Sequence, residues 1–497
     1  MADSGTKQWF RNGTVIAVLL CAALLVTLFC SCFSPLLSYI DCKDQCVFFR
    51  GGLAWTQGLT PYVDYKDVKG PLLFLLYKWG CDITPTSGIG VWIIETCSLF
   101  MLLLCLYKAS RTCGLDSGRA CLATVLSLFA MSQAEVYADG ARAELFTGTA
   151  LAGLIWQTCA FYKSRGASVR QYGLCVGACL SCGLLIKYNA AVTPLAAAAA
   201  ACGYYAGEKR WRDVATMLLW LLLGAVILLL PFILYMVYAG NLSAMYDVYF
   251  RLNAQTLAGM QNIGLQRIGR IALNAWTFPA GLASVAACIG LRKQLCSRWA
   301  VAAILCMSAS AYLVSVVGNY SYYMLYCAPV SIFAAIWLLA HMPSKLDWRL
   351  YVVVSVFTAV YAAGLNGVYL SRRGNHALFQ VLPPDQQAME DEICRKEGAK
   401  LLFVGTLDLG FGMKAGALPA CPEWVTLNGA PELYKERQLD AIRSRKPDYV
   451  IVANHTAKLP DGFFTLLEQS GYGNTGLRIH IPHRQDMEIV QLYKKNK

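Results

Sequence analysis

The sequence predicts a polytopic α-helical membrane protein that ends in a small α/β domain. Of its 497 residues, 57% are hydrophobic and only 15% are charged, whereas soluble domains carry about 25% charged residues. Apolar runs of about 20 residues, long enough to cross a hydrocarbon core, recur as far as residue 371. From residue 372 charges return and the apolar runs shorten. We therefore expect a transmembrane domain over 1–371 and a soluble domain over 372–497.

The apolar runs predict about eleven membrane spans. The clearest covers 216–239, TMLLWLLLGAVILLLPFILYMVYA, which has no charged residue. We place the spans at 14–36, 88–107, 118–136, 143–162, 171–187, 189–206, 214–239, 271–291, 299–318, 325–341 and 350–370.

Lys and Arg gather in the short loops on one side of these spans. They include Lys108 and Arg111, Lys209 to Arg212, and Arg292 and Lys293. Such loops face the cytoplasm, so we expect the N-terminus inside and 372–497 outside the cytoplasm. The same rule accounts for much of the net charge of +13, and we expect no nucleic-acid partner.

The opposite side carries two long loops, 37–87 and 241–270. In the first, CVFFRGGLAW has helical spacing and predicts an amphipathic helix in the membrane interface, with Trp55 near the headgroups. Pro71 opens a second apolar helix, PLLFLLYKW, which is too short to span. We interpret Arg50 and Lys78 as residues that snorkel toward the interface.

The C-terminal domain alternates strand and helix patterns. KLLFVGTL and DYVIVAN predict buried strands, 431–445 and GFFTLLEQSG predict helices, and LRIHIP and EIVQLY predict further strands. This alternation is typical of an α/β layer structure.

Acids and cations lie on the predicted outer face, where ionisable groups at membrane depth indicate function. The first loop contains Asp44, Tyr62, Asp64, Asp67 and Lys69. Further along are Asp139 and Glu144 in YADGARAELF, and Lys187 at the end of a span. Asp64 and Asp67 also fit simple turn residues around Pro61.

The first loop resembles that of the GT-C glycosyltransferases, in the bacterial branch related to protein O-mannosyltransferases and the aminoarabinose transferase. The shared pattern is an Asp, an aromatic residue, a Gly, Pro-Tyr-x-Asp and Lys-Gly-Pro, which here are Asp44, Phe48, Gly58, 61–64 and 69–71. AELF at 143–146 resembles the family's second acidic motif. YYMLYCAP at 322–329 resembles a later motif, with Tyr322 where the family usually has His.

The resemblance implies a glycosyltransferase of the cell envelope in the bacterial inner membrane. The donor is a polyprenyl-phosphate sugar and the acceptor a glycan, lipid or protein hydroxyl, with membrane lipids as surroundings. Asp44 is then the catalytic base, and Lys69 and Lys187 neutralise the lipid phosphate. The expected substrate-binding or phosphate-binding residues are Lys69, Lys187, Glu144, Asp139, Asp64, Asp67, Tyr62 and Tyr322. Because a Lys replaces the divalent ion, we expect no obligatory metal cofactor. In such an enzyme we expect the C-terminal domain to cover the active site or to recruit the acceptor.

Two other functions remain open on the sequence. A transporter or lipid flippase also has many spans and a few charges, but it typically shows broken helices and internal repeats, which this sequence does not display. A non-catalytic assembly subunit is the other alternative, because Gln45 and Tyr322 depart from the family pattern.

Overall fold

A computed structural model describes residues 2–36, 43–137, 139–255, 284, 286–287, 289–295, 297–317, 321–342, 347–372, 382–427, 432–453, 459–482 and 487–496. The chain forms two compact units. The first comprises Met1–Ser31, Glu95–Phe232 and Ile263–Tyr369, and the second comprises Cys32–Ile94, Ile233–Asn262 and Leu370–Lys497.

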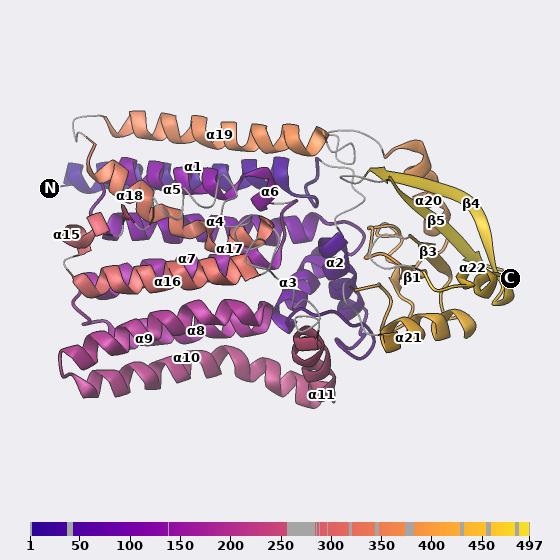
Figure 1. Ribbon diagram of the computed structural model, residues 1–497. Coiled ribbons are helices and arrows are strands. Elements are labelled where there is room, and N and C mark those ends of the chain that lie inside the picture. The colour runs from indigo at the N-terminus through magenta and orange to yellow at the C-terminus, as the bar shows by residue number, and fades with distance from the viewer. Residues whose placement is uncertain are drawn as a thin grey trace. The chain divides into compact units, whose positions relative to one another are not determined.

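Apolar helices build the first unit, and they run alongside one another in Figure 1. They are α1 (Ala2–Cys30), α4 (Ile89–Thr112), α5 (Ser117–Met131), α7 (Ala143–Lys163), α8 (Val169–Ile186), α9 (Val192–Gly207), α10 (Trp211–Tyr238), α16 (Arg298–Val317), α18 (Ile332–Ala340) and α19 (Trp348–Arg372). Short helical turns lie between them: α6 (Ala134–Tyr137), η1 (Tyr188–Ala191), α15 (Arg292–Leu295), η3 (Ser321–Tyr323), α17 (Met324–Cys327) and η4 (Ala328–Ser331).

The helices of the first unit follow the apolar runs of the sequence. Each predicted span except 271–291, which lies almost wholly outside the described residues, coincides with helical structure. Within the described part of the chain, six helices are long and apolar enough to cross a membrane. These helices and the fold support an integral membrane protein, whereas the span number of about eleven stays a prediction.

The second unit contains the first loop and the C-terminal segment. The first loop forms α2 (Lys43–Thr56) and α3 (Pro71–Ile83), and the later loop forms α11 (Leu242–Met245) and the π-helix η2 (Tyr246–Leu252). Residues 45–54 of α2 are all buried in the protein. The predicted helix is therefore confirmed, but over these residues no face of it is left exposed. Asp41, an acid before this helix that we expect to cap its N-terminus, lies outside the described residues.

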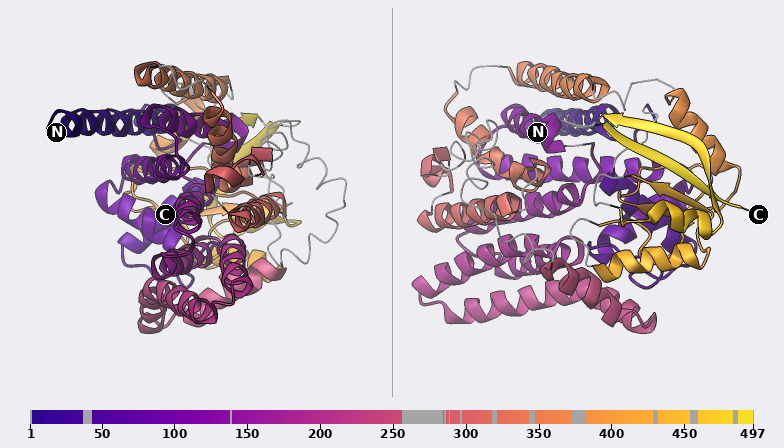
Figure 2. Two further views of the ribbon diagram at one scale, coloured as in Figure 1. Left: turned by 90° about the vertical axis from the view of Figure 1, so that its left-hand side faces the viewer. Right: turned by 45° about the vertical axis from the view of Figure 1, so that its right-hand side comes forward.

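A five-stranded sheet forms the core of the C-terminal segment, with strand order β2-β1-β3-β5-β4. Its strands are β1 (Lys400–Val404), β2 (Leu418–Pro419), β3 (Tyr449–Val452), β4 (Tyr472–Pro482) and β5 (Met487–Lys495). β1 pairs in parallel with β2 and β3, while β5 runs antiparallel to β3 and β4. Figure 2 shows β4 and β5 as the longest strands of this sheet.

Three helices accompany the sheet: α20 (Pro384–Cys394), α21 (Glu432–Arg443) and α22 (Phe463–Gln469). The strand and helix patterns identified in the sequence are confirmed, while α20 and the short β2 were not predicted. The proposed boundary at residue 372 stays a prediction.

Candidate active site

Asp44 lies in the first turn of α2 and is half-buried. An acidic side chain at this position is favoured by the positive end of the helix dipole. The following turns of α2 are buried from Gln45 to Ala54. The helix thus holds a carboxylate at its end on a backbone fixed by packing.

The segment after α2 is a tight turn stabilised by its own side chains. The backbone N–H of Thr60 donates to Asp64 Oδ2 at 2.7 Å, and the Tyr62 N–H donates to the Tyr65 carbonyl at 2.8 Å. Tyr62 has a φ of 66°, a left-handed conformation that is uncommon outside glycine. Its buried ring brings the hydroxyl to the Lys69 carbonyl, to which it donates at 2.7 Å. Asp64 and Tyr62 therefore shape the turn that leads to Lys69.

Lys69 lies two residues before Pro71, the first residue of α3. Its Nζ lies 5.7 Å from the centroid of the Phe48 ring, a cation–π contact with α2. Pro71 opens α3 as predicted. Gly70, the residue between Lys69 and α3, has φ −79° and ψ 159°, a conformation that any residue adopts.

Asp67 is buried, with 4% of its surface exposed. Its Oδ1 accepts from the Val68 N–H at 2.7 Å, and its Oδ2 has no hydrogen-bond partner among the described residues. Burial raises the pKa of this carboxyl, and Asp44 raises it further, while Lys69 lowers it. The three predicted residues Asp44, Asp67 and Lys69 thus interact electrostatically within the second unit.

In the first unit, α7 and α8 bring Glu144 and Lys187 together. Glu144 lies in the first turn of α7 and Lys187 caps the end of α8. Lys187 Nζ donates to Glu144 Oε1 at 2.5 Å, and the two side chains are 14% and 5% exposed. The same Nζ lies 3.1 Å from the centroid of the Tyr323 ring. Both charged groups are therefore largely shielded from water.

Tyr322 precedes Tyr323 in the sequence, and its own ring contacts a second cation. The guanidinium carbon of Arg142 is 3.9 Å from the centroid of the Tyr322 ring. Arg142 is the residue before α7, two positions from Glu144. Tyr322 therefore stacks against the loop that leads into the second acidic motif.

Glu95, which the sequence reasoning missed, holds that loop. It lies in α4 with no exposed surface. Its carboxylate accepts from the Tyr137 hydroxyl at 2.6 Å, from the Ser31 hydroxyl at 2.5 Å and from the backbone N–H of Ala141. The signal that identifies it is in the sequence, because a single Glu inside an apolar run such as 88–107 indicates a functional residue.

Asp139, a predicted binding residue, belongs to the same loop and is 8% exposed. Asp139, Gly140 and Ala141 have φ values of 71°, 74° and 46°, so three successive residues are left-handed. Successive N–H groups in such a turn converge on an anion. Here the anion is a carboxylate of the protein itself, because Glu95 accepts a hydrogen bond from the Ala141 N–H.

The structure thus assembles two groups of predicted residues, each within its own unit. Asp44, Asp67 and Lys69 form the first-loop group, with Tyr62 and Asp64 shaping its backbone. Glu144, Lys187 and Tyr322 form the bundle group, with Asp139 in the adjoining loop. Among the described residues, no three His, Cys, Asp or Glu side chains are grouped to hold a metal ion; independence from metal stays a prediction.

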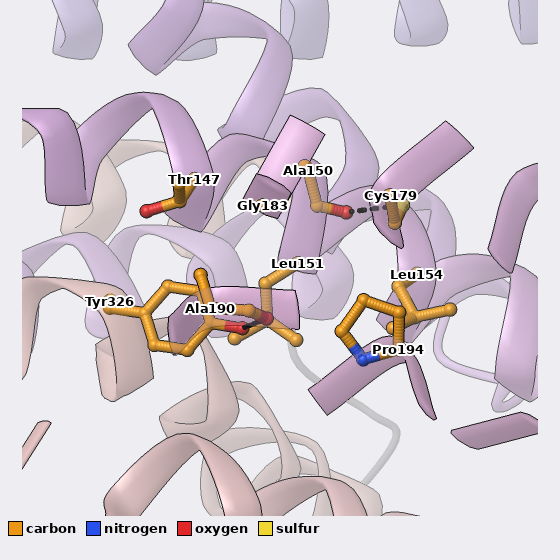
Figure 3. A pocket seen from close by; sticks show the side chains of 9 residues that line it. All are labelled: Thr147, Ala150, Leu151, Leu154, Cys179, Gly183, Ala190, Pro194 and Tyr326. Carbon is orange, nitrogen blue, oxygen red and sulfur yellow. Dashed lines mark hydrogen bonds between the residues drawn. The ribbon is translucent and has the colours of Figure 1, made fainter. Parts of the chain in front are cut away.

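Figure 3 shows a cavity inside the first unit. Its lining includes Thr147 and Leu151 of α7, Cys179 of α8 and Tyr326 of α17. Tyr326 donates to the Ala190 carbonyl at 3.0 Å. With about 10 Å³ of room the cavity takes roughly one water molecule, so it is too small for a sugar.

The chain has the fold seen in the solved structures of ArnT and AftD, which confirms, for the fold alone, what the resemblance of the first loop implies. No family model matches the chain, and no curated protein matches its sequence.

The similar solved structures include ArnT from Cupriavidus metallidurans in the apo state, with a TM-score of 0.58 and 12% identity over 97% of this chain and 98% of that one. ArnT from the same organism bound to undecaprenyl phosphate has a TM-score of 0.59 and 12% identity over 96% of this chain and 97% of that one. Arabinofuranosyltransferase AftD from Mycobacteria has a TM-score of 0.51 and 13% identity over 97% of this chain and 40% of that one.

Proposed function

We propose that this protein is a membrane glycosyltransferase that moves a sugar from a polyprenyl-phosphate lipid to an acceptor hydroxyl on the outer face of the membrane. The observation that carries the proposal is the first-loop group, in which a half-buried carboxylate at the start of α2 and a lysine at the start of α3 interact with the same buried aspartate. The fold shared with ArnT, which has been solved with undecaprenyl phosphate, supports it.

In the proposed reaction, Asp44 accepts the proton of the acceptor hydroxyl as its oxygen bonds to the anomeric carbon. The bond from that carbon to the phosphate oxygen breaks, and the lipid phosphate leaves with the electron pair. Lys69, beside the N-terminus of α3, neutralises the leaving phosphate with help from the helix dipole. The negative charge that develops on the leaving phosphate is therefore stabilised by groups that are already in place.

For the bundle group we propose binding roles of its own, as the resemblance of its motifs implies. Glu144 Oε1 accepts a hydrogen bond from Lys187. In this proposal the second carboxylate oxygen of Glu144 accepts a hydrogen bond from the sugar or the acceptor and orients it. Lys187 is the second candidate for the phosphate. Tyr322 and Asp139 are proposed to line the substrate, while Tyr62 and Asp64 act through the backbone of the 60–69 turn.

The test is mass spectrometry of products formed by the purified protein, reconstituted in lipid nanodiscs, from a panel of polyprenyl-phosphate sugars and candidate acceptors. We expect an acceptor mass increased by one sugar and an equal amount of released polyprenyl phosphate. In sealed vesicles, transbilayer movement of the lipid-linked sugar with no transfer product in either system contradicts the proposal and favours a flippase.

A further inference from the structure

Arg50, in the middle of α2, is buried and is held by the C-terminal segment. It is 1% exposed. Its Nε donates to Asp408 Oδ2 at 2.7 Å and its Nη2 to Asp408 Oδ1 at 3.2 Å. Nη1 donates to the Ala417 carbonyl at 2.6 Å, and Nη2 also donates to the Phe411 carbonyl at 2.7 Å. The interpretation of Arg50 as a snorkelling residue is therefore wrong.

Asp408 lies in the loop that follows the carboxyl end of β1. The loop is preorganised, because the Gly410 N–H donates to Asp408 Oδ1 at 2.8 Å and Gly410 has a φ of 92°. The rings of Phe403 and Trp424 lie 5.7 and 5.5 Å from the Arg50 guanidinium carbon. The carboxyl ends of parallel strands are where open α/β sheets bind their ligands. In this domain the loop at the carboxyl end of β1 binds Arg50 of the same chain.

A second attachment holds the segment that leads to Lys69. The backbone N–H of Lys66 donates to the Pro422 carbonyl at 2.9 Å. Its Nζ donates to Glu423 Oε1 at 2.6 Å, with the Glu423 side chain 9% exposed. The C-terminal segment thus contacts both parts of the backbone that carries the first-loop group. It binds α2 through Arg50 and the 60–69 turn through Lys66.

A buried ion pair adds little net stability, because desolvation offsets the attraction, but it penalises every arrangement that separates the charges. Arg50 makes four hydrogen bonds to three residues, so α2 can neither rotate nor slide without losing several of them. Asp44 is six positions earlier, about 9 Å along the same helix axis. Fixing Arg50 therefore fixes the backbone that carries Asp44.

We infer that Arg50 is a positioning residue and that the C-terminal α/β segment is the frame that holds Asp44 in catalytic geometry. The inference rests on the proposed function for its catalytic readout. It assigns to the segment a task other than recruiting the acceptor. A misplacement of about 1 Å costs up to about a hundredfold in rate, so loosening α2 is expected to lower kcat more than it changes substrate binding.

The experiment compares Arg50→Met with Arg443→Met, in the full-length protein. Arg443 belongs to an ion pair in which both side chains are 55% exposed, so its loss is a matched control. We expect Arg50→Met to lower kcat by about tenfold or more with the donor KM within about twofold of wild type. We also expect faster amide hydrogen exchange over residues 43–56, with the helices of the first unit unchanged. Arg443→Met is expected to resemble wild type in both measurements.

Lys66→Met is the second variant, because its ion pair is partly exposed and its loss is milder. If Arg50→Met does not fold, Lys66→Met decides: it is expected to lower kcat severalfold and to speed exchange over 60–69. A folded Arg50→Met with wild-type kcat and wild-type exchange in α2 overturns the inference and leaves the proposed function standing. If wild-type protein transfers no sugar, the proposed function fails, and hydrogen exchange alone still tests the attachment of α2.

Discussion

Lys187 at the end of α8 donates to Glu144 in the first turn of α7 across 2.5 Å, with both side chains largely buried. The two residues are 43 positions apart in sequence. Removing one partner of such a pair leaves the other charge without compensation in a site poor in water.

Lys187→Met is therefore expected to destabilise the protein by about 3–5 kcal/mol, because Glu144 loses its cation. The double variant Lys187→Met with Glu144→Gln should regain a substantial part of this loss, since no charge is then left unpaired. Thermal unfolding in detergent measures both. Equal melting temperatures for wild type and Lys187→Met contradict a buried pair.

Lys69→Ala is expected to weaken use of the lipid donor by roughly ten- to a hundredfold, because a charge-assisted bond to phosphate contributes about 1.5–3 kcal/mol. Lys69→Arg should keep part of the activity, since it keeps the charge but changes the geometry. Donor saturation curves separate these effects. Some loss of stability is expected near neutral pH, because the buried Asp67 carboxyl loses the cation that lowers its pKa, so the curves are measured at a temperature at which the variant is folded. Unchanged kinetics in folded Lys69→Ala would leave only a role as a membrane anchor.

Asp67→Asn tests the raised pKa of the buried carboxyl. In the folded protein this pKa lies above its value in the unfolded chain. The linked stabilisation is then complete below about pH 4 and is lost as pH rises through the folded value. We expect Asp67→Asn to melt above wild type near neutral pH, with the difference closing toward about pH 4. A gap independent of pH contradicts this account; exposed Asp440→Asn serves as the control.

Gly140→Ala tests the loop held by Glu95. Gly140 has a φ of 74°, and an added Cβ would collide with Glu95 Oε1. Gly114, with a φ of 98°, has open space where its Cβ would lie. Each substitution pays for a left-handed conformation, about 1 kcal/mol, but only Gly140→Ala also displaces the carboxylate. A clearly lower melting temperature for Gly140→Ala than for Gly114→Ala is expected; equal values contradict the packing described here.

The sequence predicts the helices well because long apolar runs and local turn signals determine them. Pro71 marks the start of α3, and the C-terminal strand patterns fall on β1, β3, β4 and β5. These features depend on neighbours a few residues away, which periodicity and composition report directly.

What the sequence does not predict depends on distant partners. Arg50 and Asp408 are 358 positions apart, and nothing local distinguishes a buried arginine from one that reaches the interface. The same holds for the Tyr62 hydroxyl, which turns back to the Lys69 carbonyl and not toward a ligand. The motifs identify the residues, but they do not distinguish those that shape the backbone from those that can contact a substrate.

The measurement that tests the central claim most directly compares wild type with Asp44→Asn in a transfer assay read by mass spectrometry. Asn is nearly isosteric but cannot take the acceptor proton, so general-base catalysis, typically worth about 10²–10⁴-fold, is lost. We predict a transfer product with wild type and a rate at least about a hundredfold lower with Asp44→Asn, at an unchanged melting temperature. Near wild-type transfer by Asp44→Asn contradicts the account.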